Sequence, residues 1–373
     1  GEYGVIVSNK FLRANYGRPV RALLGLEAAV REIVDLGGLS VFPEATVRAA
    51  LLIARGGRGA AVRPRWGEVA RLDPERFAES VDRALATLDP AAVGGEDWTL
   101  APATVAALMA RLAQTCISLG DAVDGQICWG SKTEQDEAFV VDRARRDALV
   151  GEDPRSAELL KPLVVGEEVR RYHLDRADQF LIYVPHGSDL LGYPAVLRHL
   201  ERYRDALERR ATAASHAWYE LQQPQEAYAT AFAGPKIVYP EIANTPRFAM
   251  DRAGHVINNK CFAIPGDRWP LLVLLNSRAA FFLLSHIGAR LEGGNAAAQF
   301  VEQRAQYMAR LPVPPTRQTT QPNVRSETAA WLKSLYARGV RLAGVEPEIP
   351  DDIRALGDRL ASLPGVNRVA LFG

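Results

Sequence analysis

Cysteine is scarce in this chain of 373 residues, which contains Cys116, Cys128 and Cys261 and no others. An odd number at wide spacing, with no Cys-x-x-Cys pair, supports neither a disulfide framework nor a zinc site built on cysteine. Free thiols are typical of a reducing compartment. We therefore expect a cytoplasmic protein.

Neither sign of charge predominates, because 45 Lys and Arg residues face 44 Asp and Glu residues. This balance excludes a protein that holds nucleic acid by bulk charge alone, so any site for a polyanion must be a local patch. A hydrophobic content of 48% and a charged content of 24% are typical of globular proteins. The length favours two or three folded units.

Long hydrophobic runs and known catalytic motifs are also missing. The most apolar stretch, 269–289, is interrupted by Asn276-Ser277-Arg278, so it predicts a buried segment and no membrane contact. The sequence contains no dinucleotide-binding, phosphate-loop, metalloprotease or serine-hydrolase motif. The histidines show no ligand spacing, so no metal site is expected; they are His173, His186, His199, His216, His255 and His286. Residue chemistry alone indicates a binding module rather than an enzyme.

Periodicity predicts an α+β protein in four parts. Residues 1–60 show strands at 3–7, 30–36 and 46–53 and a helix at 14–24. The apolar run 3–7 is typical of a buried parallel strand, and three strands with one helix cannot cover both faces of a sheet. We therefore expect the C-terminal part of an α/β domain whose neighbouring strands lie elsewhere.

The remaining three parts have different textures. Residues 61–115 predict a helical bridge, and residues 116–315 predict a mixed, β-rich domain with helical inserts at 194–220 and 269–289. Residues 316–373 predict a linker and a helical tail. Short strand-like runs occur in the third part at 127–130, 138–142, 179–184, 236–239, 247–251 and 261–264.

Phe42 is the first residue with a chemical implication. It lies in a Phe-Pro corner between two apolar strands, where its ring could stack on a flat ligand such as an extruded base. A hydrophobic plug in a hairpin is the alternative interpretation.

At this point the sequence resembles a family. Residues 4–24, followed by the segment 41–47 (Val-Phe-Pro-Glu-Ala-Thr-Val), are similar to the late part of the catalytic domain of N6-adenine DNA methyltransferases of the TaqI type and of the fused type IIG restriction-modification enzymes. The resemblance implies that Phe42 stacks on the flipped target adenine.

The β-rich part resembles the TaqI-like C-terminal specificity domain, and its landmarks occur in order over about two hundred residues. They lie at 130–140, 160–172, 235–251, 274–277 and 311–314. The resemblance implies sequence-specific binding of double-stranded DNA in a restriction-modification system.

The resemblance also implies what this stretch does not do. Such enzymes bind S-adenosylmethionine through a Gly-rich loop and transfer its methyl group at an Asn-Pro-Pro-Tyr motif, and neither occurs here. We expect S-adenosylmethionine to be the methyl donor of the intact enzyme and this stretch alone to bind none. An upstream catalytic or nuclease domain of the same polypeptide is the implied partner. The alternative is a stand-alone specificity subunit that recruits a separate catalytic chain, and a third possibility is an interaction scaffold without a nucleic-acid role.

Recognition of DNA needs cations for phosphates and planar or amide groups for base edges. Arg247 is the best candidate for a base edge, because its guanidinium can pair with guanine. An ordinary strand-end cation is the alternative, and Lys236 could equally keep a strand edge soluble. The predicted DNA-contacting residues are Lys132, Thr133, Arg170, Arg171, Lys236, Asn244 and Arg247.

Overall fold

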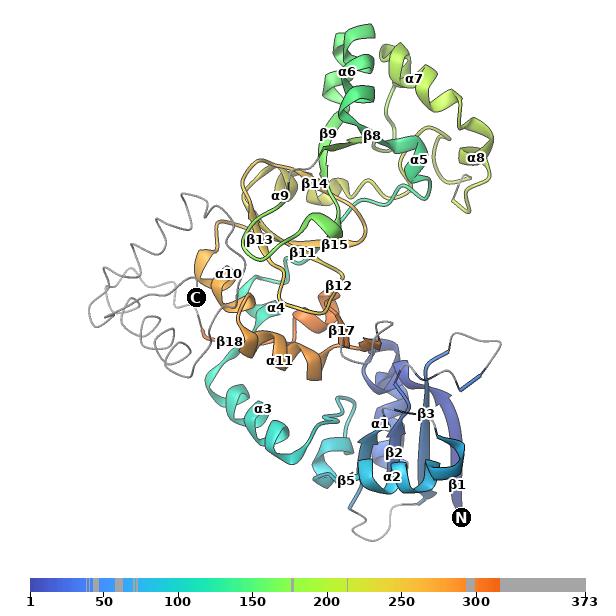
Figure 1. Ribbon diagram of the computed structural model, residues 1–373, viewed down its shortest axis with the longest axis vertical. Helices are drawn as coiled ribbons and strands as arrows, with labels where there is room; N and C mark the ends of the chain where they lie inside the picture. Colours follow the sequence, from blue (N-terminus) through green and yellow to red (C-terminus); the bar gives the residue numbers. More distant parts are fainter. Residues whose placement is uncertain are drawn as a thin grey trace, which may run out of the picture. The chain divides into compact units, whose positions relative to one another are not determined.

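The computed structural model describes residues 1–37, 39, 41–42, 47–57, 63–69, 71, 73–175, 178–212, 214–292 and 299–315. The predicted linker and tail at 316–373 lie outside the described residues. The chain divides into two compact units (Figure 1). Unit 1 comprises residues 1–125, 241–245 and 282–314, and the described part of unit 2 comprises residues 126–240, 246–281 and 315. Helices and sheets are mixed in both, so the α+β prediction is confirmed.

A five-stranded sheet organises the first part of unit 1, in the order β1-β3-β2-β4-β5. The antiparallel strand β3 separates β1 from β2, and β4 runs parallel to β2. Side chains alternate between the two faces, so Ile33 packs on the α1 side and Val34 on the α2 side. The elements are β1 (Glu2–Ser8), α1 (Arg18–Glu27), β2 (Ala28–Asp35), β3 (Ala49–Gly56), β4 (Arg65–Glu68), α2 (Phe77–Ala84) and β5 (Ala86–Thr87).

The prediction of a buried parallel strand at 3–7 is wrong. Strand β1 pairs antiparallel with β3 and forms an edge of the sheet, where Tyr3, Val5 and Ile6 are each about two-fifths exposed. An apolar run indicates that a strand needs cover, but it does not show that the cover lies within the same stretch of sequence. The predicted helical bridge at 61–115 also contains two strands, β4 and β5, which complete the sheet.

The rest of unit 1 joins distant segments of the chain. Strand β6 pairs with β18, and β12 and β16 flank β17. The predicted bridge does contain one long helix, α3. The elements are α3 (Ala103–Thr115), β6 (Ile117–Ser118), α4 (Leu119–Ala122), β12 (Ile242–Ala243), α11 (Arg278–Ile287, which begins in unit 2), β16 (Arg290–Glu292), β17 (Gln299–Glu302), α12 (Ala305–Met308) and β18 (Pro312–Val313).

Unit 2 contains two four-stranded sheets, in the orders β14-β9-β10-β8 and β13-β11-β15-β7. The first packs with α6, α7 and α8 around a core that includes Phe139, Leu181 and Leu200, and the second packs with α9 around Val238 and Ala263. The elements are β7 (Cys128–Trp129), α5 (Asp136–Phe139), β8 (Val140–Asp142), α6 (Arg143–Glu152), β9 (Leu160–Val164), β10 (Gln179–Ile182), α7 (Pro194–Glu201), α8 (Arg204–Glu208), α9 (Ala229–Ala233), β11 (Lys236–Pro240), β13 (Ala249–Asp251), β14 (Val256–Ile257), β15 (Cys261–Pro265) and α10 (Trp269–Leu275).

The two predicted helical inserts are both divided. The first consists of α7 and α8 and is helical only to Glu208, and the second consists of α10 and α11 with a break at Asn276 and Ser277. No single helix among the described residues is long and apolar enough to cross a membrane. The bent pair α10 and α11 reaches that length and apolar composition only when the two helices are counted together.

Candidate nucleic-acid interface

A tight turn in unit 2 presents two of the predicted arginines. The backbone N–H of Arg170 donates to the carbonyl of His173 at 2.9 Å, which closes the turn. Tyr172 within it has a φ of 75°, a conformation that is costly for a bulky side chain. Its N–H donates to the carbonyl of Phe248 at 2.8 Å, so the turn is held against the start of β13.

Arg247 stands immediately before this attachment point and is half-buried. Burial lowers the pKa of the Arg247 guanidinium, and the nearby positive charge of Arg170 lowers it further. The Glu167 carboxylate acts on the pKa of Arg247 in the opposite direction. Guanidinium groups gathered on neighbouring segments favour a polyanion. Arg170 also forms an ion pair with Asp175 at 2.6 Å. The Arg170 side chain is 43% exposed, so solvent screens this pair. We name Arg170, Arg171 and Arg247 the arginine cluster.

Arg171 is oriented by a backbone carbonyl rather than by an acid. Its Nη2 donates to the carbonyl of Asn276 at 2.6 Å, and its guanidinium lies 5.7 Å from the ring centre of Tyr172. Its buried Nε has no hydrogen-bond partner within the described part of the chain. A buried donor without a partner is uncommon, and it leaves capacity for an acceptor from a ligand.

Asn276 anchors the cluster. This fully buried residue ends α10, and its side-chain amide binds both backbone groups of Phe248: Oδ1 accepts from the N–H at 3.2 Å, and Nδ2 donates to the carbonyl at 2.8 Å. Because its own carbonyl accepts from Arg171, one residue fixes the backbone beside Arg247 and the side chain of Arg171. The sequence indicated only that this residue interrupts a buried apolar segment.

Lys132, Thr133 and Asn244 are the predicted contacts outside the arginine cluster. Lys132 is half-buried in a backbone bridge to Gln223, and its Nζ is 3.9 Å from Glu134. Thr133 is 6% exposed and its hydroxyl donates to Asp136, so burial removes it from the DNA-contacting set. Asn244 is exposed and belongs to unit 1.

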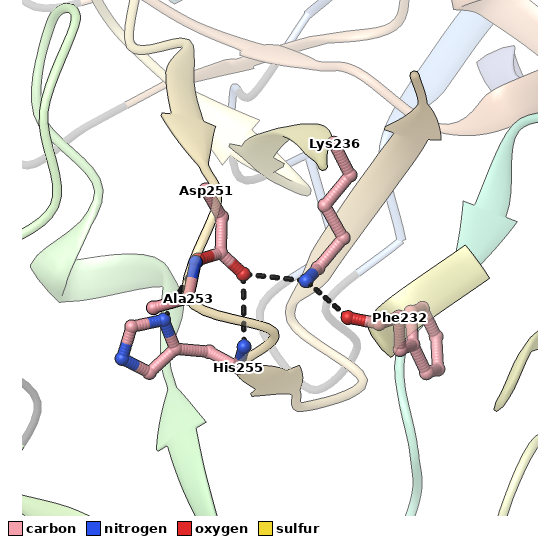
Figure 2. A network of polar contacts seen from close by, with 5 residues as sticks. All are labelled: Phe232, Lys236, Asp251, Ala253 and His255. Carbon is pink, nitrogen blue, oxygen red and sulfur yellow. Dashed lines mark hydrogen bonds and ion pairs between the residues drawn. The ribbon is translucent and has the colours of Figure 1, made fainter. Parts of the chain in front are cut away.

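The prediction that Lys236 contacts phosphate is wrong. Strand β11 lies between β13 and β15, so Lys236 is completely buried and forms an ion pair with Asp251 (Figure 2). Its Nζ also donates to the carbonyl of Phe232 at 2.6 Å. Burial lowers the pKa of Lys236 against the opposing effect of Asp251.

Asp251 is the centre of this buried network. Besides Lys236, it accepts from the N–H of Ala253 at 2.9 Å, from the N–H of His255 at 3.0 Å and from the imidazole Nδ1 of His255 at 2.8 Å (Figure 2). Burial acts to raise the pKa of the Asp251 carboxyl, but the hydrogen bonds and charges of His255 and Lys236 together hold it below its usual value. The network therefore closes the β13–β14 turn and has a structural role.

Phe42 lies in unit 1 and is 40% exposed, while its neighbour Val41 packs against the core. This exposure disagrees with a buried plug. The base of the loop is fixed by Asp35, which is 2% exposed and accepts from Arg13 at 2.9 Å and from the N–H of Gly37 at 3.0 Å. Residues 43–46, which include the predicted start of the next strand, lie outside the described residues.

Comparison with known proteins identifies the β-rich region. Residues 161–313 match the TaqI-like C-terminal specificity domain. The type II methyltransferase M.PaeR7I of Pseudomonas aeruginosa is 24% identical over 354 residues, which cover 89% of this chain and 59% of that protein. The type II methyltransferase M.BanIII of Aneurinibacillus aneurinilyticus is 25% identical over 304 residues, which cover 71% and 51%. The chain thus spans only 59% and 51% of these two relatives.

A solved structure shares the fold. The type IIL restriction-modification enzyme MmeI, determined in complex with DNA, superposes with a TM-score of 0.52 at 14% identity, covering 99% of this chain and 47% of that one. The resemblance stated from the ordered landmarks is confirmed: this chain carries a specificity domain of the kind found in type II restriction-modification methyltransferases.

Proposed function

We propose that this chain is the DNA-recognition part of an adenine-N6 DNA methyltransferase of a restriction-modification system. The observation that carries the proposal is the arginine cluster, which lies within the matched specificity domain and combines three guanidinium groups on one fixed turn and strand. Guanidinium groups bind phosphates and the O6 and N7 atoms of guanine. Arg247 is the proposed base-edge contact, and Arg170 and Arg171 are the proposed phosphate contacts.

The apolar surface of unit 1 supports fusion to a larger catalytic domain. Large side chains of β1 are exposed at the sheet edge, and on α1 Val20, Leu23 and Leu26 are 47%, 60% and 50% exposed. Exposed apolar groups gathered on one edge and one helix are typical of an interaction surface. Since the relatives are longer than this chain, we propose that further strands of the same polypeptide cover it. This favours the fused enzyme over the stand-alone subunit.

S-adenosylmethionine is the methyl donor we propose for the whole enzyme, as the type II methyltransferase relatives suggest. The residues of this chain do not fit it. The Gly-rich loop through which such enzymes bind S-adenosylmethionine does not occur in this sequence. The sequence also has no Asn-Pro-Pro-Tyr motif. The proposed part of this chain in methyl transfer is limited to Phe42, which would stack on an extruded adenine.

Binding of duplex DNA over a range of salt concentrations tests the arginine cluster. For a specific site, Arg247→Ala should weaken the free energy of DNA binding by about 1–3 kcal/mol and relax the sequence preference at one base position. Arg171→Ala should weaken all sequences alike and reduce the salt slope by about 1. Arg143→Gln is the matched control, since this exposed cation pairs with Asp178 at 2.8 Å outside the cluster. Equal losses in all three variants would refute the proposal.

Phe42 is tested in the full-length enzyme. Phe42→Ala should lower methyl transfer while duplex affinity stays nearly unchanged, because the ring acts only on the extruded base. Phe42→Trp retains an aromatic face and is the control. Unchanged turnover in Phe42→Ala would remove the stacking role.

A further inference from the structure

Two histidines and a glutamate meet in unit 2, on segments other than those that carry the arginine cluster. His186 follows strand β10, and His216 and Glu220 follow helix α8. One atom of each residue that can ligate a metal lies within 4.8 Å of the other two. The two imidazole rings are stacked, with their centres 4.9 Å apart and their planes at 13°. His186 and His216 are 30 residues apart, which explains why no ligand spacing is visible in the sequence.

Backbone carbonyls determine which imidazole nitrogens are free to bind. Nε2 of His186 lies 2.9 Å from the carbonyl of Leu221, and Nδ1 of His216 lies 3.0 Å from the carbonyl of Ala217. A carbonyl only accepts, so these two nitrogens carry the protons. Nδ1 of His186 and Nε2 of His216 then retain their lone pairs. Donation of the second imidazole N–H to a carbonyl is the usual arrangement around a metal-bound histidine.

Glu220 supplies an anionic oxygen at a fixed position. It is 3% exposed, and its two oxygens accept from the N–H groups of Gly187 at 2.6 Å and of Ala217 at 2.8 Å. Each oxygen has a second lone pair available for a metal. These hydrogen bonds also tie Glu220 to the residues that follow His186 and His216, so the three ligands share one framework.

We propose that His186, His216 and Glu220 bind one divalent transition-metal ion, with Zn²⁺ as the best match to two imidazoles and a carboxylate. A tetrahedral Zn²⁺ with bonds of about 2.0–2.1 Å places its ligand atoms roughly 3.3 Å apart, so the three groups must move closer together. Because the lone pairs lie in the ring planes, the two stacked imidazoles must also tilt towards a common point. His186 is exposed and can make this movement. The hydroxyl of Thr212, 3.2 Å from Nε2 of His216, would turn away. Solvent would supply the fourth ligand.

The ion would join two loops that carry other functional segments. The segment from His216 to Glu220 continues to Gln223, which pairs with Lys132 through two backbone hydrogen bonds of 2.9 and 3.0 Å. A bound metal would therefore constrain the segment that forms the backbone bridge with Lys132. A metal that binds the folded state alone also raises thermal stability.

Calorimetric titration of the untagged, metal-free chain with Zn²⁺, together with Co²⁺ absorption, tests the site. We expect one saturable site per chain and a rise in melting temperature with Zn²⁺. His186→Ala and His216→Ala should each weaken binding at least tenfold and abolish the rise, whereas His173→Ala, a histidine outside the cluster, should leave both unchanged. His186→Ala guards against misfolding, because that side chain is exposed. The proposal is overturned if no saturable binding is found at a 100-fold excess of Zn²⁺. It is also overturned if binding is unchanged in His186→Ala, which would indicate that other ligands, such as the cysteine thiols, hold the ion.

Discussion

Replacement of Asp251 by Asn would remove one charge from the buried network and leave its shape intact. In the parent, Lys236 is completely buried and has two oxygen partners, the Asp251 carboxylate and the carbonyl of Phe232. The amide of the introduced Asn carries no charge, so it cannot neutralise the Lys236 ammonium group. Its NH2 group would replace one of the two carboxylate oxygens and would face a donor of Lys236 or of His255, so that two donors oppose each other. Lys236 would then be a buried charge without a counterion.

The expected loss follows from this burial. Removing one partner of a buried ion pair costs about 3–5 kcal/mol, far more than the loss of an exposed pair. For a unit of this size, a change of 1 kcal/mol shifts the melting temperature by about 2–4 °C, so the shift should be roughly 6–20 °C. Lys236→Met together with Asp251→Asn removes both charges, so the double variant should be less destabilised than the sum of the single variants by about 0.5–3 kcal/mol.

Urea denaturation and thermal melting, followed by circular dichroism, measure these differences. Glu208→Gln is the control, because its exposed pair with Arg204 within α8 should leave the midpoint close to that of the parent. An Asp251→Asn variant within about 0.5 kcal/mol of the parent, or a strictly additive double variant, would refute the assignment of a stabilising buried charge pair.

Three further predictions concern the same unit. Because the pKa of Asp251 is lowered on folding, its stabilisation is complete above about pH 4 and is lost as the pH falls below that value, so the urea midpoint of the parent should fall more steeply in acid than that of Asp251→Asn. Gly130→Ala should lower the free energy of unfolding by about 1–3 kcal/mol or more, since its Cβ would lie 2.0 Å from the carbonyl oxygen of Asn258. Gly151→Ala in helix α6 is the control, because its Cβ would meet open space and the change should be neutral or stabilising. Thermal melting compares the two variants. Asn276→Ala should reduce specific DNA affinity, measured by fluorescence anisotropy, more than non-specific affinity, and an equal loss in both would contradict a positioning role.

Short strands in unit 2 were predictable because each is a run of β-branched, aromatic or aliphatic residues bounded by turn formers. The predicted runs 179–184 and 261–264 correspond to β10 and β15 with shifts of one or two residues. The neighbours of a strand were less predictable. Lys236 precedes an apolar strand, as an edge lysine would, and only the pairing of β11 with strands on both sides shows that it is interior.

Candidate site residues that depend on tertiary contacts show the same limit. Arg170 and Arg247 were both predicted individually, from residue type and from their place near strands. Their proximity arises because the N–H of Tyr172 donates to the carbonyl of Phe248, a contact between segments 76 residues apart. Local sequence contains no signal for such a bond, since it joins two backbone groups that every residue type possesses.

Asn276 explains how a single side chain makes this contact specific. A backbone carbonyl has two lone pairs, and that of Phe248 uses them for the N–H of Tyr172 and for Nδ2 of Asn276. The same amide accepts from the N–H of Phe248, so the strand is held from both its donor and its acceptor side. Aspartate could accept but not donate here, and leucine could do neither. The charge of the cluster therefore resides in its arginines, whereas its geometry depends on one buried amide.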